Sequence, residues 1–144
     1  MKILFFVSFI FTGLIPADPL ATWDILAKVK FSPVFFKEFN EQFLVPQFDA
    51  KIKAYEGKEM IFKGYYMPID LEDSRTIILS KFPYSQCFFC GGAGPESVVE
   101  VVFPLKHPRL KADQIIIVKG TLALNDKDIN HMNFILKNAT IVIQ

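Results

Sequence analysis

The sequence predicts a mainly β protein, built as a small barrel that follows N-terminal helices. From residue 58 onward, five segments are rich in Ile, Val, Phe and Tyr, and each is bounded by Asp, Asn, Gly or Pro. Two of them carry an internal glycine, Gly64 and Gly120, where a strand bends as barrel closure requires. Together these features favour a five-stranded Greek-key barrel of the OB type over residues 57–144, with an open α+β sheet as the alternative. The segments are Lys58–Ile69, Arg75–Phe82, Ser97–Phe103, Gln114–Leu124 and Asn133–Ile143.

Residues 1–17 have the features of a secretory signal peptide. A basic start, Met1-Lys2, precedes an apolar run over residues 3–15 and then Pro16-Ala17, with cleavage expected after Ala17. The run is shorter than the roughly 20 residues that span a bilayer comfortably. We therefore expect export, most simply to the periplasm of a Gram-negative bacterium, and membrane association only if this segment stays uncleaved.

Residues 18–56 are expected to form a helical segment packed on the barrel. Thr22 caps a short helix, and Ser32-Pro33 is a second helix start, with serine as N-cap and proline at the first helical position. Asp49 caps a third helix over residues 50–56, which Gly57 ends. The second helix is expected to present one apolar face, made of Phe36, Phe39 and Phe43, and to end at Pro46.

The charge balance argues against a nucleic-acid partner. The full chain has a formal net charge of +1, and loss of residues 1–17 removes Lys2 and no acid, which leaves a neutral domain. Phosphate binding requires a basic surface. No paired catalytic carboxylates, Ser-His-Asp set or nucleotide loop stands out, so the sequence favours a protein that is not an enzyme.

The chemistry-bearing residues gather in one loop, over residues 87–97. It contains both cysteines, Cys87 and Cys90, and three of the seven glycines. Two thiols at this spacing can hold zinc or copper(I), work as a redox dithiol, or form a small structural disulfide in an oxidising compartment. A glycine-rich stretch follows Cys90, whereas thioredoxin-type motifs place the first cysteine at the start of a helix. This difference argues against the redox interpretation.

The predicted topology selects a third ligand for a metal. In an OB barrel the third and fifth strands are parallel, so the loop with the thiols and the loop with His131 lie at the same end. His107 is expected at the opposite end. The resulting hypothesis is a metal site of Cys87, Cys90 and His131, with a fourth ligand from Asp126, Asp128 or Glu96.

The glycines of the loop have two interpretations. Gly91, Gly92 and Gly94 could form a nest of backbone N–H groups for an anion. Because neither a phosphate-loop lysine nor a helix accompanies them, we expect instead that they supply the positive φ angles of a tight loop.

The run Gly57-Lys58, the stretch Lys63-Gly64-Tyr65-Tyr66-Met67-Pro68-Ile69, Cys87 and a valine-rich strand resemble an exported bacterial family, numbered 3299 among domains of unknown function. The likeness covers about Trp23 to Val142. In that family a histidine follows two residues after the cysteine, and then a run of prolines. Here Phe89 and Cys90-Gly91-Gly92 stand in their places. The resemblance implies export and an OB-like barrel, and it implies no activity.

Three functional hypotheses follow from the sequence. The leading one is a non-enzymatic, exported binding domain that holds a soft metal ion, zinc or copper(I), through its CxxC loop. The second is a thiol–disulfide redox protein. The third is an interaction domain with inert cysteines that docks on a protein partner in the envelope.

Overall fold

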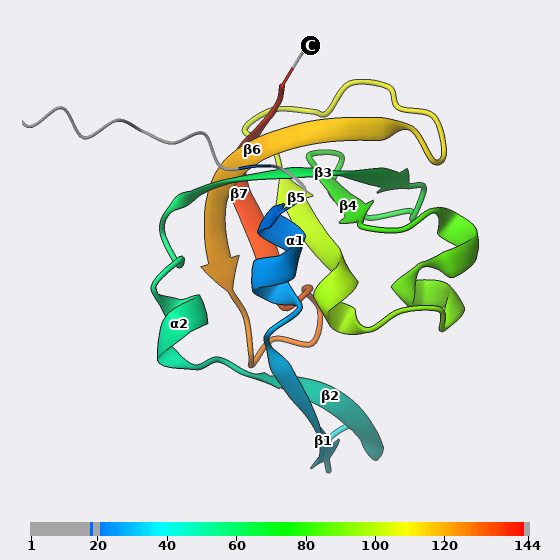
Figure 1. The fold of residues 1–144 in the computed structure, drawn as a ribbon. Coiled ribbons are helices and arrows are strands. Elements are labelled where there is room, and N and C mark those ends of the chain that lie inside the picture. The colour runs from blue at the N-terminus through cyan, green and yellow to red at the C-terminus, as the bar shows by residue number, and fades with distance from the viewer. Residues whose placement is uncertain (1–17, 19–20, 143–144) are drawn as a thin grey trace, which may run out of the picture.

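The computed structural model describes residue 18 and residues 21–142, so the predicted signal peptide over residues 1–17 lies outside the described residues. Within these residues the chain is mainly β (Figure 1). No helix in this part of the chain combines the length and apolar character needed to cross a membrane. The principal elements are α1 (Ala21–Leu26), β1 (Lys30–Phe36), β2 (Glu41–Gln47), α2 (Ala50–Lys53), β3 (Glu59–Met67), β4 (Thr76–Ser80), β5 (Val98–Val102), β6 (Ile115–Leu124) and β7 (Phe134–Ile141).

The five predicted strands form a closed barrel in the order β3-β4-β5-β7-β6. Strand β5 pairs in parallel with β7, and every other pairing in the barrel is antiparallel. This is the strand order and direction of an OB barrel, so the predicted fold class is confirmed. Closure also leaves the barrel without a free sheet edge.

The two strand glycines permit close approach of neighbouring backbones. A Cβ on Gly64 would lie 2.5 Å from the carbonyl oxygen of Ser80, and one on Gly120 would lie 2.7 Å from that of Lys137. The register between β6 and β7 shifts at Gly120, between Lys119 and Thr121, as expected for a β-bulge. The strand glycines therefore mark the irregular positions that help the sheet curl closed.

Helix α1 covers the barrel and contributes two residues to its interior, Trp23 and Leu26. The Trp23 ring packs edge-on against Phe62 at 5.0 Å between centroids, and its Nε1–H donates to the carbonyl oxygen of Lys63 at 2.8 Å. An indole needs such a partner once it is buried. Asp49 caps α2 as predicted, accepting from the backbone N–H groups of Lys51 and Ile52.

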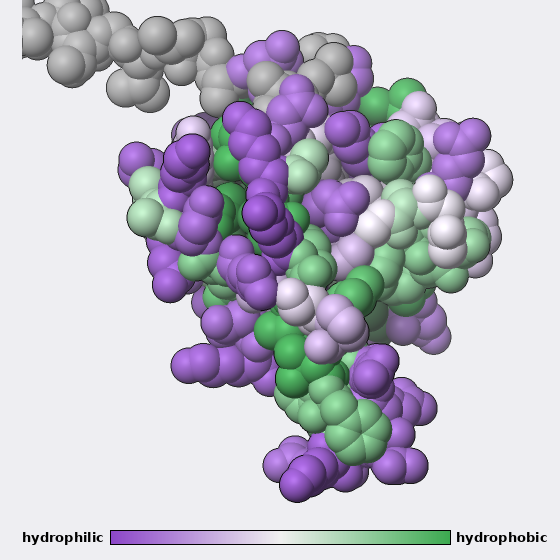
Figure 2. All heavy atoms as spheres, turned by 60° about the horizontal axis from the view of Figure 1, so that its bottom comes forward, coloured by the Kyte–Doolittle hydropathy of each residue, from purple (hydrophilic) through white to green (hydrophobic). Residues whose placement is uncertain are grey.

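The predicted helix from Ser32 is wrong, because this stretch is the hairpin of β1 and β2. Its strands pair from Lys30 opposite Gln47 to Phe36 opposite Glu41, and Pro33 and Pro46 lie inside them. Proline is tolerated in strands whose N–H side is free, as in a two-stranded ribbon. Residues 18–56 are therefore helical only in part. In Figures 1 and 2 the hairpin projects from one end of the barrel.

Phe36, Phe39 and Phe43 do come together, but across the turn of this hairpin. Phe43 packs edge-on against Phe36 at 5.4 Å and against Phe39 at 5.9 Å between ring centroids. The turn that brings them together includes Asn40, which has a positive φ of 53°. The spacing that suggested one helical face thus corresponds to one cluster on a ribbon.

Candidate functional site

The candidate site lies at the barrel end where the loop after β4, the loop after β6 and the hairpin meet. Strand β5 leads to it and is buried on both faces. Because side chains alternate along a strand, Val99 and Val101 enter the main core, whereas Val98 belongs to a second cluster with Met67, Ile78 and Cys87. Met132 of the loop after β6 packs against this second cluster. The two loops predicted to share an end therefore do so.

The thiol pair lies in a loop of short 3-10 turns. Cys87 is fully buried, whereas Cys90 is exposed at the end of the turn Phe88–Cys90. The two sulfurs are 3.8 Å apart, and the Cys90 thiol donates to the carbonyl oxygen of Tyr84 at 3.0 Å. One thiol is thus accessible and the other lies behind it.

The surroundings of Cys90 do not activate its thiol. Desolvation raises the pKa of Cys90, and the hydrogen bond shared with the Cys87 thiol and the charge of that neighbouring sulfur raise it further. Redox catalysts of the CxxC type lower the pKa of the attacking thiol. A raised pKa therefore argues against a catalytic redox role for the pair.

Of the three loop glycines, only Gly91 has the predicted positive φ, 76°, as the left-handed residue that ends its turn. The prediction is wrong for Gly94, whose φ is −82°, and for Gly92, which is not among the described residues with positive φ. Gly92 is needed for space instead, because a Cβ there would lie 2.8 Å from the carbonyl oxygen of Gln86. The N–H groups of Gly91 and Gly92 donate to Phe88 and Cys87 within the loop.

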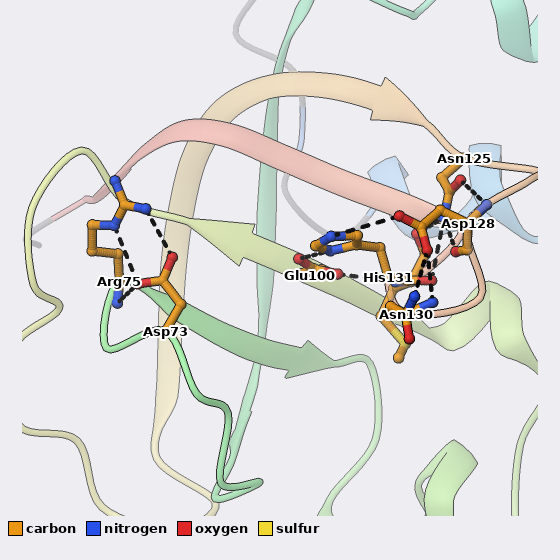
Figure 3. A network of polar contacts seen from close by, with 8 residues as sticks. Asp73, Arg75, Glu100, Asn125, Asp128, Asn130 and His131 are labelled. Atoms are coloured by element: carbon orange, nitrogen blue, oxygen red, sulfur yellow. Dashed lines mark hydrogen bonds and ion pairs between the residues drawn. The ribbon is translucent and has the colours of Figure 1, made fainter.

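A buried carboxylate holds the second loop in place. Glu100 is 5% exposed, on β5, and accepts the Nδ1–H of His131 at 2.8 Å and the backbone N–H of Met132 at 2.9 Å (Figure 3). A buried charge requires such partners. Asn125 orders the rest of the loop, since its side chain donates to the carbonyl oxygen of Asp128 and accepts from the Asp128 N–H.

These contacts set the charge at the barrel end. The hydrogen bond to Glu100, and secondly the negative charge of Glu100, raise the pKa of His131. Hydrogen bonds from the backbone and side chain of Asn130 lower the pKa of Asp128, and His131, with Nε2 4.0 Å from an Asp128 oxygen, lowers it further. The loop therefore presents an ionised Asp128 beside a histidine that gains a proton more readily than usual.

The structure brings the predicted metal ligands to the same end of the barrel without assembling them around one point. No three His, Cys, Asp or Glu side chains of the described residues are grouped so as to hold a metal ion. The Nδ1 of His131 is engaged by Glu100, and Cys87 is buried. The site of Cys87, Cys90 and His131 stays a prediction. His107 lies elsewhere, beside the rings of Tyr66 and Phe103.

A pocket of about 280 Å³ opens between the hairpin and the two loops. Its lining is mostly apolar, and it includes the two groups whose charge the loop adjusts, Asp128 and His131. Apolar pockets that bring together a few polar groups of shifted pKa are the usual places of ligand binding. The hairpin contributes Phe36 and residues 42–46, the thiol loop and start of β5 contribute Phe88, Pro95 and Val98, and the β6–β7 loop contributes residues 126–129 and 131–133.

Sequence reasoning missed two parts of this site, Glu100 and the hairpin wall. A signal for Glu100 exists, because one acid stands between two pairs of valines in a strand, where a charge must be either buried with partners or on an exposed face. The hairpin has no decisive signal, because its Phe- and Val-rich composition favours strands while Ser32-Pro33 also fits a helix start.

The comparisons add no relative to this picture. Searches against protein-family models, curated proteins and solved structures each returned no match. The resemblance to the exported family stays a prediction.

Proposed function

We propose that this chain is a non-enzymatic, exported binding domain, and that it holds a protein partner of the cell envelope in the pocket at the barrel end. The observation that carries the proposal is the convergence of three segments, distant in sequence, on one apolar pocket. Two of its walls are fixed, since Glu100 anchors the β6–β7 loop and Cys87 anchors the thiol loop in the second cluster.

The third wall, the hairpin, supports the same proposal. Its apolar side chains include four that are large and 43–51% exposed, Val34, Phe35, Phe39 and Leu44. In Figure 2 the apolar colour runs along the projecting hairpin, with polar side chains around its tip. Of these four, Leu44 lines the pocket, and exposed apolar surface with a polar rim is typical of an interaction site.

Site-specific photocrosslinking in cells that export the protein tests this function. A photoreactive residue at Ile129, which lines the pocket, is expected to give a discrete product with an envelope protein. The same residue at Leu105, which is 78% exposed and outside the pocket, is the matched control and should give none. Leu44→Lys should remove the Ile129 product. Equal products from both positions would contradict a pocket-specific function.

The second candidate function is binding of a soft metal ion by the thiol pair, and the sulfur spacing favours it. Two thiolates bound to tetrahedral zinc at about 2.3 Å lie roughly 3.8 Å apart, and the sulfurs of Cys87 and Cys90 are 3.8 Å apart. His131 would supply a third ligand if its ring broke its hydrogen bond to Glu100 and turned toward the thiols.

Titration of the reduced protein with zinc or copper(I) tests this candidate. Stoichiometric binding should be abolished by Cys90→Ala and weakened by His131→Gln. Failure of the reduced protein to take up either metal would contradict it. Intact mass without reductant shows the competing state, a Cys87–Cys90 disulfide, as the loss of two hydrogen atoms.

A further inference from the structure

The pocket runs along the edge of β2. The residues from Gln42 to Pro46 all line it, although consecutive side chains of a strand point to opposite faces. Because residues of both faces line the cavity, the backbone of β2 is part of its wall, and the cavity borders the free edge of this strand. In the part of the chain that the structure describes, β2 pairs with β1 alone, so this edge carries no partner strand.

The prolines identify which backbone groups face the groove. Residues directly opposite in an antiparallel pair alternate between hydrogen-bonded and non-hydrogen-bonded pairs. Pro33 is opposite Leu44, and Pro46 is opposite Phe31. Because proline has no N–H to exchange, both belong to the non-hydrogen-bonded set, and Gln42, two residues from Leu44, does too. The N–H and C=O groups of Gln42 and Leu44 therefore point to the free edge.

These groups are open to a new partner. No backbone hydrogen bond from another described segment reaches Gln42 or Leu44. Each edge of the ribbon lacks one N–H, at Pro33 on β1 and at Pro46 on β2, so the prolines do not distinguish the two edges. The pocket does, because residues 42–46 of β2 line it and Pro33 does not. An extended peptide that adds to a sheet edge takes its affinity from such main-chain bonds and its specificity from pockets for alternate side chains.

The charge of the facing wall defines the peptide further. Asp126 lines the pocket, is exposed and forms no ion pair among the described residues, and Asp128 is held ionised. Glu41, at the start of β2, is exposed and likewise forms no ion pair with a described residue. Lys127 is the one lysine in the lining. In the lining itself the carboxylates of Asp126 and Asp128 outnumber Lys127, and His131 is paired with the buried Glu100, which leaves a groove that suits a basic ligand.

We propose that the partner is bound as an extended segment that adds a third strand to the free edge of β2, with an apolar side chain in the pocket and Lys or Arg residues opposite Asp126 and Asp128. This inference rests on the proposed function and names the chemistry of its partner. The groove between the β2 edge and the β6–β7 loop then holds main chain as well as side chains.

Selection of random peptides displayed on phage against the purified exported chain provides the probe. The enriched peptides are expected to carry one large apolar residue flanked by Lys or Arg, and to lose binding to Ile129→Lys. The best peptide is then synthesised and its affinity measured by calorimetry. Enrichment of acidic flanks, or of no peptide that depends on Ile129, would overturn the inference.

Three hairpin variants separate strand addition from side-chain docking. Leu44→Pro removes an N–H at the groove edge and should weaken binding by up to about tenfold, the equivalent of one hydrogen bond. Leu44→Ala loses the same side chain but keeps the N–H, so its loss should be smaller. Phe35→Pro removes the outward N–H on the far edge, opposite Gln42, and should change affinity less than about twofold.

Methylated peptides repeat the test on the unaltered protein. Methylation of alternate amides, those that face β2, should abolish binding, and methylation of the intervening amides should not. If peptide binding depends on Ile129 but is unchanged by both Leu44→Pro and methylation, strand addition is wrong, whereas the proposed binding function of the pocket is retained. A photocrosslink at Ile129 with no peptide binder likewise overturns only this inference. Self-association of the chain that Leu44→Pro abolishes would identify a second copy as the occupant and overturn the assignment of a basic partner.

Discussion

Replacement of Glu100 by Gln should lower the stability of the chain far more than its small chemical change suggests. Glu100 is 5% exposed and accepts two hydrogen bonds, from His131 at 2.8 Å and from the Met132 N–H at 2.9 Å. Gln keeps one acceptor oxygen for the Met132 N–H, and its NH₂ can donate to His131 once Nδ1 of the neutral ring acts as acceptor, so both bonds persist without the charge of the carboxylate.

The size of the effect follows from the charge that both bonds lose and from their exposure to water. The His131 side chain is 51% exposed, so its nitrogen can bond to solvent, whereas the Met132 bond is partly buried. A hydrogen bond to a charged group contributes about 1.5–3 kcal/mol and one to a neutral group about 0.5–1.5 kcal/mol, and both bonds of Glu100 change from the first kind to the second. We therefore expect Glu100→Gln to lower the free energy of unfolding by about 2–3 kcal/mol.

Urea and thermal unfolding of the purified chain measure this loss. For a domain of this size, 1 kcal/mol corresponds to roughly 4 °C, so the melting temperature should fall by about 8–12 °C. Glu59→Gln is the matched control, because Glu59 is on a barrel strand with a 61% exposed side chain in a surface ion pair with Lys119. That variant should stay within about 0.5 kcal/mol of the wild type. An equally small effect of Glu100→Gln would refute the buried-anchor argument.

Two further predictions concern the β6–β7 loop and the β6 bulge. The pKa of His131 is raised in the folded chain, so its stabilisation is complete below the unfolded pKa of about 6.5 and disappears as the pH rises through the folded value. His131→Gln should therefore lower the urea midpoint at acidic pH and change it less at alkaline pH; a larger loss at alkaline pH would contradict this. Gly120→Ala should cost about 1–3 kcal/mol in urea unfolding, because its Cβ would lie 2.7 Å from a backbone oxygen. Gly57→Ala, which meets nothing within 4 Å but has a φ of 77°, should cost only about 1 kcal/mol for its left-handed backbone, and equal losses would contradict the steric argument.

The barrel could be predicted from the sequence because its signals are local. Each strand is a β-rich segment between turn residues, and the two internal glycines mark the bend points, so strand number and order followed from one fold choice. The same choice placed the thiol loop and His131 at one end. The fold choice could not predict the side-chain geometry, because the position of the His131 ring relative to Cys90 depends on its hydrogen bond to Glu100.

The hairpin could not be predicted from the same signals because two structures satisfy them. Phe36, Phe39 and Phe43 fit one face of a helix, and they fit equally a ribbon whose turn lies between the first and the last of them. Ser32-Pro33 is a common helix start and also an acceptable edge-strand pair. Only packing against the barrel end decides between the two, and that information is not local.

The hairpin is also the part of the fold that gains most from a partner. A two-stranded ribbon is at best marginally stable by itself, whereas a third strand adds main-chain hydrogen bonds and covers apolar side chains. Here the ribbon exposes Leu44 at the groove, and its tip is held by three phenylalanines that pack on one another. The barrel end supplies a rigid second wall, because Glu100 and the buried Cys87 fix both loops. A bound strand would therefore complete the sheet that β1 and β2 begin.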